Sequence, residues 1–211
     1  MTLWQAIVGY TTVAAVMTII PGLDTVFVLR QALRDRRAVA FASGLGICAG
    51  TLVWGTAAAA GVAALFVASQ TAFTVLRFAG VGYLLWLAWG YLRSAWQGTG
   101  GVVLDESRPE RMGVGDAFVR GLLTNLLNPK IAVFYLTVLP LFLPAGYPKI
   151  AVGAGLAGIH ALLGIAWFAV IIAGAQAVRR FLATRRGTRV VDATAGVAMA
   201  GFAVALGVEH R

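Results

Sequence analysis

The most restrictive feature of the sequence is the run from residue 38 to residue 76, which contains no Asp, Glu, Lys or Arg. A transmembrane helix needs about 20 mostly apolar residues, so this run is too long for one crossing and suits a helix, a turn and the start of another. Across the whole chain 60% of the residues are hydrophobic and only 12% are charged. Soluble domains carry about a quarter charged residues, and disordered chains are far less hydrophobic. The sequence therefore predicts an integral membrane protein.

The formal net charge of +9 would suit nucleic acid if the basic residues formed one polar face. They cluster instead in short stretches between long uncharged runs, as loops at a membrane surface do. We therefore expect the lipid bilayer, and not nucleic acid, as the partner. The single cysteine, Cys48, leaves neither a disulfide framework nor the spacing of a zinc site. We expect no metal and no cofactor.

Charges and turn residues divide the chain into stretches of the length that a bilayer requires. We predict an all-α membrane protein with six transmembrane helices. These helices are expected over residues 3–29, 41–66, 73–92, 118–143, 150–178 and 190–208.

The orientation follows from the Lys and Arg residues of short loops, which concentrate on the cytoplasmic side of a membrane. Thirteen of them follow the first, third and fifth predicted spans, and only Lys149 and Arg211 belong to the opposite side. Both termini are therefore expected outside the cytoplasm.

The two halves of the chain resemble each other weakly but in order. PGLDTVFVL, which begins at Pro21, aligns with PKIAVFYLT, which begins at Pro129, and GLGICAGTLVWG aligns with GAGLAGIHALLG. We expect a first three-helix repeat over residues 1–96, a cytoplasmic linker over 97–115 and a second repeat over 116–211. Three spans per half require inverted repeats, each with a proline-broken first helix. Such repeats are typical of secondary transporters, which bind substrate where broken helices meet.

Two charged residues lie deep inside predicted spans, each shortly after a proline. Asp24 follows Pro21-Gly22, and Lys130 follows Asn128-Pro129. A charged side chain at this depth costs roughly 3 kcal/mol on insertion scales and usually has a functional role. Each proline frees a carbonyl of the preceding turn, and the helix that starts after it suits a carboxylate at its N-terminus. Asn128 is expected as an N-cap, with proline in the first helical position.

We hypothesise that these breaks bind an amino acid. Lys130 and the helix N-termini would hold its carboxylate, while Asp24 with the carbonyls of Met17 and Asn125 would hold its ammonium group. In the alternative interpretation, Asp24 and Lys130 only pair with each other, or Asp24 only caps its own helix. The predicted substrate-binding residues are Pro21, Gly22, Asp24, Asn125, Asn128, Pro129 and Lys130.

Three further positions are weaker candidates for the cavity or for a proton relay. Thr51 and Trp54 lie in the second predicted span, and His160 lies in the fifth. A histidine can relay protons inside a membrane, or it can hydrogen-bond a neighbouring helix. The glycines around Thr51 are more typical of close helix packing.

Four segments together resemble the LysE/RhtB family of bacterial amino-acid exporters over nearly the whole chain. They are PGLDT, GLGICAGTLVWG, AFTVLRFAGVGYLLWLAWGYLR and GLLTNLLNPKIAVFYLTVLPLF. Leu23 stands where the family usually has a second proline. The resemblance implies export of an amino acid such as lysine, homoserine, threonine or leucine. It also implies location in the bacterial cytoplasmic membrane and coupling to protons, and alternating access is the mechanism we expect.

Other functional classes have less support. Ser43 and His160 are the only serine and histidine within the spans, and no nucleophile elbow or HExxH motif is present. We therefore expect no catalytic residues and no enzyme. A channel needs a continuous polar lining, for which the spans hold too few polar residues. Export of another small solute or ion, or a membrane scaffold that transports nothing, stays an alternative. The small-residue faces leave a homo-oligomer open.

Overall fold

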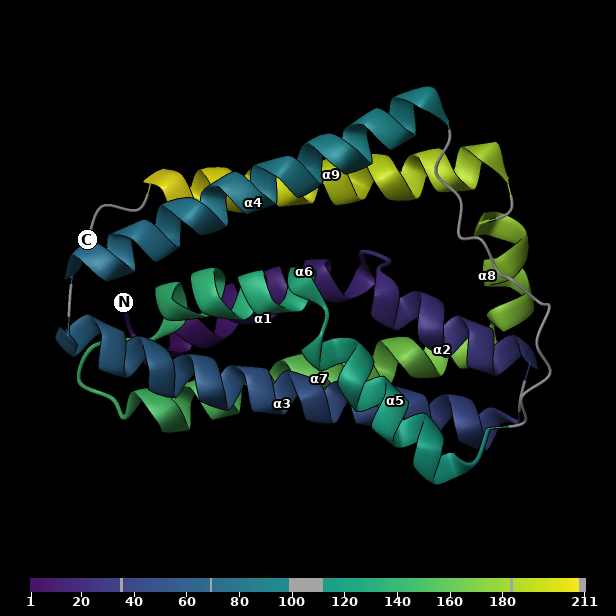
Figure 1. The fold of residues 1–211 in the computed structure, drawn as a ribbon, viewed down its shortest axis with the longest axis horizontal. Helices are drawn as coiled ribbons and strands as arrows, with labels where there is room; N and C mark the ends of the chain where they lie inside the picture. Colours follow the sequence, from purple (N-terminus) through teal and green to yellow (C-terminus); the bar gives the residue numbers. More distant parts are fainter. Residues whose placement is uncertain (35, 69, 99–111, 183, 209–211) are drawn as a thin grey trace.

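The computed structural model describes residues 1–34, 36–68, 70–98, 112–182 and 184–208 (Figure 1). Regular structure in these ranges is entirely helical. Most helices lie lengthwise beside one another, and the N-terminus and the end of α9 are at the same end of the molecule. The helices are α1 Leu3–Ile19, α2 Leu23–Arg34, α3 Arg37–Ala68, α4 Gln70–Gln97, α5 Val114–Leu126, α6 Pro129–Val133, α7 Lys149–Ala173, α8 Ala175–Leu182 and α9 Arg185–Val208.

The described part of the chain contains several helices that suit a membrane. By length and composition, Arg37–Gly61 of α3 and the whole of α7 are each long and apolar enough to cross one. The α1–α2 pair and the α5–α6 pair satisfy the same requirement if each bent pair is one span. This gives two to four candidate spans. The expected linker over 97–115 falls largely on residues 99–111, which lie outside the described ranges.

Pro21 and Pro129 each interrupt a helix, as the sequence predicts. α1 ends before Pro21, and the axis bends by 52° before α2 continues. At the second break, the axis bends by 53° between α5 and the helical stretch Pro129–Phe142, which begins with α6. Asn128 is the N-cap of α6, its side-chain oxygen accepts the Lys130 N–H at 3.1 Å, and Pro129 opens the helix. The cap and the proline start the new helix without a lost hydrogen bond.

The helix that follows the second break is irregular. After α6 the chain continues as a π-helical turn over Phe134–Val138 and a 3-10 turn over Leu139–Phe142. Pro140 lies in this 3-10 turn. Because proline has no N–H and clashes with the turn before it, a regular α-helix cannot continue through this position.

Glycines allow α3 to pack closely against α5 and α7. A Cβ atom at Gly46 would overlap the carbonyl oxygen of Phe118 in α5, and one at Gly55 would overlap the Ala157 side chain in α7. The predicted role of these glycines in helix packing is confirmed. α3 and α7 pack closely with the two bent pairs. α4 and α9 pack along each other on one side of this group of helices (Figure 1).

The predicted end of the fifth span, at residue 178, is wrong. α7 ends at Ala173, and Gly174 follows as its C-cap, so the helix does not reach residue 178. The separate helix α8 carries the exposed Arg179 and Arg180 in its last turn and buries Ala175 and Leu182. An amphipathic helix of this kind suits the surface of a membrane better than its interior. In Figure 1, α8 runs across the end of the molecule opposite the termini.

Candidate functional site

The first helix break contributes a carboxylate to the second. Asp24 lies in the first turn of α2. Its Oδ2 accepts a hydrogen bond from Asn125 Nδ2 at 2.8 Å, and its Oδ1 accepts one from Asn128 Nδ2 at 3.2 Å. Asn125 and Asn128 are 0% and 2% exposed. Both amides that bind the carboxylate are therefore buried at the second break.

The second break contributes a cation to the first. Lys130 lies one residue after Pro129, and its Nζ donates to the carbonyl oxygen of Ile20 at 3.1 Å. A Cβ atom at Gly22 would lie 3.1 Å from this Nζ and 3.4 Å from the Cε of the same lysine. The lysine therefore lies against the peptide backbone of the first break, and glycine provides the space for it.

The two charged residues do not pair directly. Within the described part of the chain, Asp24 and Lys130 form no ion pair, because each is bound by neutral groups of the opposite break. Neither oxygen of Asp24 accepts an N–H of α2, so the carboxylate does not serve as a simple cap. The arrangement differs from both structural alternatives to substrate binding.

One detail of the predicted site is wrong. The carbonyl of Asn125 is not free, because it accepts the backbone N–H of Asn128 at 3.0 Å. The 3-residue spacing of this bond tightens the last turn of the helix and satisfies a group that the proline would have orphaned. The carbonyl that accepts a hydrogen bond from Lys130 is that of Ile20. Met17 lines the cavity beside it, and its carbonyl stays a prediction for the substrate ammonium group.

A cavity of about 40 Å³ lies between the breaks. Space of this size holds about three water molecules. Six predicted residues line it, and the lining does not include Trp54, Pro21, Asn128 or Pro129. The six are Gly22, Asp24, Thr51, Asn125, Lys130 and His160.

The three weaker candidates have different positions. The Thr51 hydroxyl lines the cavity but donates to the Ile47 carbonyl at 3.2 Å. His160 lines the cavity, and its Nδ1 lies 3.0 Å from the Tyr135 hydroxyl, with the two rings stacked at 5.8 Å. The hydrogen bond to a neighbouring helix is therefore present, and the proton relay stays a prediction. Trp54 packs against the main hydrophobic cluster instead.

Sequence reasoning missed several lining residues that share helix faces with the candidates. Ile47 and Cys48 precede Thr51 by four and three residues, and Gly164 and Phe168 follow His160 at intervals of four. Residues three or four apart lie on the same face of a helix. This spacing could have found all four from Thr51 and His160.

Charged residues of both signs border the cavity. Asp24 and Lys130 face the same cavity from different helices. Asn125 Oδ1 is buried without a hydrogen-bond partner, although the amide nitrogen of the same side chain binds Asp24. Buried polar atoms are normally satisfied, so this oxygen is a position where a water molecule or a ligand could donate a hydrogen bond.

Comparisons with known proteins agree with this chemistry. The family described as LysE type translocator matches residues 15–210. The threonine efflux protein of Escherichia coli (strain K12) is 30% identical over 189 residues, which cover 88% of this chain and 89% of that protein. The threonine efflux protein of Salmonella typhimurium is 30% identical over 186 residues, with the same coverage.

A membrane protein of Bacillus subtilis (strain 168) is 25% identical over 214 residues, which cover 97% of this chain and 99% of that protein. No solved structure matches the chain. The family and the relatives confirm the resemblance stated from the sequence motifs.

Proposed function

The chain belongs to the LysE type translocator family, and from this premise we propose that it exports an amino acid across the bacterial cytoplasmic membrane. Members of this family are transporters and not enzymes. Relatives at 30% identity are threonine efflux proteins, which makes threonine the first substrate to test.

The observation that carries the proposal is the exchange of polar contacts between the two breaks. Asp24 is held by amides of the second break, and Lys130 is held by a carbonyl of the first. In the absence of substrate, these neutral partners hydrogen-bond the two charged groups, and a ligand would replace them. A substrate ammonium group would take the place of the amide donors on Asp24, and a substrate carboxylate would take the Lys130 ammonium from the Ile20 carbonyl.

Substrate binding requires the breaks to separate. A cavity of about 40 Å³ is too small for an amino acid. The contacts that close it are hydrogen bonds between different helices, so their loss would let one bent pair move relative to the other. Alternating access then consists of closing the site toward one side of the membrane while it opens toward the other.

The proposed topology has six spans in two inverted repeats, with both termini outside. Its support is the correspondence between the halves: the bends of 52° and 53° are nearly equal. α3 also packs against α7, and α4 packs against α9, so helices at matching positions of the halves are neighbours. Inverted repeats place the substrate at the interface of the halves, which is where the breaks meet.

Proton coupling forms the last part of the proposal. Asp24 and His160 both line the cavity and both change charge when they bind a proton. The hydrogen bond between His160 and Tyr135 extends the polar path away from the cavity. A carboxylate that alternates between a proton and a substrate ammonium group would exchange the two across the membrane.

Transport by the purified protein tests the proposal. We expect proteoliposomes to move radiolabelled threonine faster than protein-free liposomes, and an imposed pH gradient to raise the rate. Asp24→Asn should remove this transport. Asp116→Asn is the matched control, because Asp116 also lies in the first turn of a helix but is exposed and outside the cavity. Equal rates for wild type and Asp24→Asn would refute the proposed site.

The substrate class is tested in the same vesicles. Transport of another common amino acid, without threonine transport, would keep the exporter and change its substrate. No transport of any amino acid by a folded protein would favour another small solute or a scaffold.

A further inference from the structure

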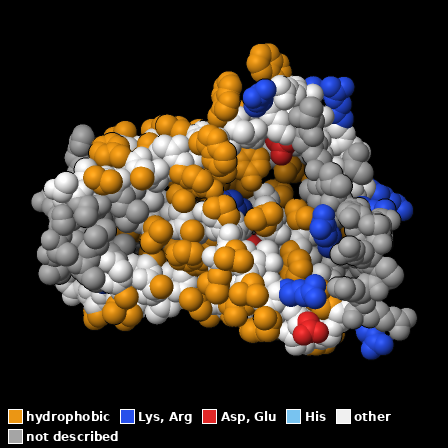
Figure 2. Space-filling view, viewed as in Figure 1, with side chains coloured by type: hydrophobic (Ala, Val, Ile, Leu, Met, Phe, Trp, Pro, Cys, Tyr) orange, Lys and Arg blue, Asp and Glu red, His pale blue; other side chains and the backbone are white. Residues whose placement is uncertain are grey.

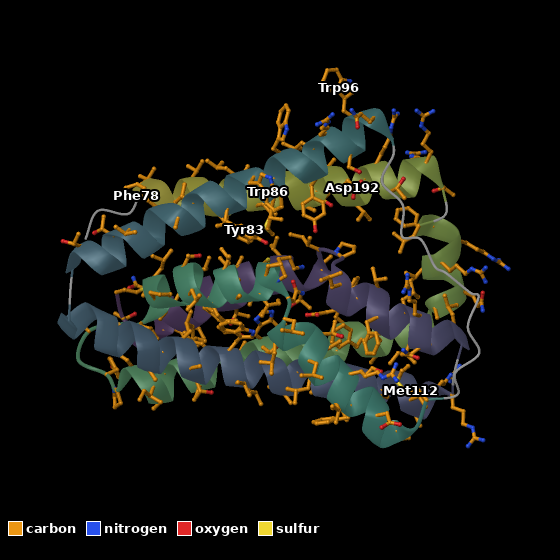
Figure 3. All side chains as sticks on the ribbon, viewed as in Figure 1. Phe78, Tyr83, Trp86, Trp96, Met112 and Asp192 are labelled. Atoms are coloured by element: carbon orange, nitrogen blue, oxygen red, sulfur yellow. The ribbon has the colours of Figure 1, made fainter. Side chains whose placement is uncertain are left out.

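A second polar region lies outside the cavity, in a groove between the α1–α2 break and the α4–α9 pair. The groove has a volume of about 630 Å³. Trp86, Trp89 and Arg93 of α4 line it together with Asp192 of α9. Figure 2 shows this side of the molecule, where basic and acidic atoms border a hollow, and Figure 3 marks Trp86 and Asp192 on the two helices.

The opposite side of the same break has a groove of similar size and different chemistry. That groove measures about 680 Å³, and no charged residue lines it within the described part of the chain. Such an apolar surface suits lipid chains. The groove beside α4 instead carries one charge of each sign, and charged side chains favour contact with water or a polar solute over contact with lipid chains. Lipid alone does not account for it.

The two charges in this groove are available to a ligand. The Asp192 carboxylate is positioned by a hydrogen bond from the Ser94 hydroxyl, at 2.7 Å between Oγ and Oδ2. Among the described residues, the Arg93 guanidinium has no hydrogen-bond or ion-pair partner. The groove therefore offers an oriented anion and an exposed cation, the same pair of charges that the inner cavity offers with Asp24 and Lys130.

The groove and the cavity are lined by one common residue within the described part of the chain. Gly22 lines both. Its missing side chain leaves the Lys130 ammonium group close behind its backbone, since a Cβ atom there would lie 3.1 Å from Nζ. A solute in the groove would thus reach the inner lysine by a small displacement of the broken segment around Pro21 and Gly22.

We propose that this groove is the cytoplasmic vestibule of the transporter, and that Arg93 and Asp192 bind the amino acid by its carboxylate and ammonium ends before it enters the cavity. The inference rests on the proposed function and deepens it. An exporter collects its substrate from the cytoplasm, and the groove lies beside the arginines of α8 and α9, at the end of the molecule that the loop charges place in the cytoplasm. The volume of the groove admits an amino acid, whereas the cavity does not.

A kinetic experiment separates the vestibule from the inner site. Inverted membrane vesicles expose the cytoplasmic face, so uptake of radiolabelled threonine reports export. Arg93→Gln and Asp192→Asn should each raise the half-saturating threonine concentration roughly tenfold, as expected for one lost charge-assisted hydrogen bond, and leave the maximal rate nearly unchanged. Arg186→Gln, an exposed arginine of α9 outside the groove, is the matched control.

A thiol experiment tests occupancy without relying on transport. Gly90 lines the groove, and a Cβ atom there would have no neighbour within 4 Å, so Gly90→Cys introduces a thiol without a clash. We expect a charged methanethiosulfonate to modify it from the cytoplasmic face, at a rate that a mixture of the common amino acids lowers several-fold. Gly82→Cys on the same helix has equal space but lies outside the groove lining, and its rate should not change. Wild type, whose Cys48 is buried, is the blank.

The outcomes are distinguishable. Unchanged half-saturation in both charge variants, or a Gly90→Cys rate that amino acids do not alter, would overturn the vestibule while wild-type transport still supports the proposed function. Reaction of this thiol only from the outer face would also overturn it. Protection without transport by wild type would count against the exporter and retain the groove as an amino-acid site.

Discussion

The two helix breaks have nearly the same bend and opposite chemistry. The first provides a carboxylate, a glycine and a backbone carbonyl, and the second provides two amides and a lysine. Neither break satisfies its own charge, since Asp24 finds its donors on the second break and Lys130 finds its acceptor on the first. The comparison teaches that two bends of nearly equal angle, which carry different side chains, form a site with two unlike ends.

The largest effect is expected when the first break loses its charge. In Asp24→Asn, a neutral amide replaces the acceptor of two hydrogen bonds, and each such bond to a charged group contributes about 1.5–3 kcal/mol. Threonine transport should fall at least roughly 100-fold. The measurement is the initial rate in proteoliposomes, with protein amount checked by gel. A rate within twofold of wild type would show that the carboxylate is not part of the site.

Removal of the charge of the second break should have a similar but smaller effect. Lys130→Met keeps most of the length of the side chain and removes the ammonium group together with its hydrogen bond to the Ile20 carbonyl. We expect a loss of roughly 10- to 100-fold in transport. The two breaks contribute unequally in this interpretation because Asp24 holds two partners and Lys130 holds one through its side chain. A larger loss in Lys130→Met than in Asp24→Asn would reverse that order.

A smaller effect tests the fit between the breaks. Gly22→Ala adds a Cβ atom 3.1 Å from the Lys130 ammonium nitrogen, which forces the end of the lysine side chain to shift. We expect a several-fold lower transport rate and little loss of stability, because the far end of a lysine is flexible. Gly82→Ala, which meets nothing within 4 Å, serves as the control. Identical rates for the two variants would show that the lysine does not need this space.

The smallest effect is expected from a substitution at the first helical position after each break, where the two breaks have different residues. Leu23 is the first residue of α2 and is 58% exposed, in the position where Pro129 opens α6. Proline is favoured at the first position of a helix. Leu23→Pro should change the thermal unfolding temperature by only a few degrees and leave transport within twofold. A large loss would mean that the N–H of residue 23 has a role that the structure does not show.

Much of the framework could be predicted from local sequence signals. Proline cannot continue an α-helix and Asn-Pro is a strong helix start, so Pro21 and Asn128 indicated both breaks without any tertiary information. Close packing at Gly46 and Gly55 was likewise indicated by small residues in apolar helices. The hydrogen-bond partners of the charged residues could not be predicted in this way. Asn125 and Asp24 are distant in sequence, and only the folded arrangement brings them together.

Other features required the fold itself. The end of α7 at Gly174 was missed because the apolar pattern continues through Ala177 and Val178, and the helix α8 that they belong to is amphipathic. The groove beside α4 was missed for a different reason. Arg93 and Asp192 each lie near the end of a predicted span, where charged residues are ordinary, and only the packing of α4 against α9 places them opposite the first break.

Binding of analogues that lack one charged end tests the central claim most directly. 3-Hydroxybutyrate has the carboxylate of threonine without its ammonium group, and 1-amino-2-propanol has the ammonium group without the carboxylate. Competition against radiolabelled threonine gives their affinities for wild type and the variants. We expect Asp24→Asn to weaken threonine and 1-amino-2-propanol but not 3-hydroxybutyrate, and Lys130→Met to weaken threonine and 3-hydroxybutyrate but not 1-amino-2-propanol. Equal weakening of both analogues by each variant would contradict a site whose two breaks hold opposite ends of one amino acid.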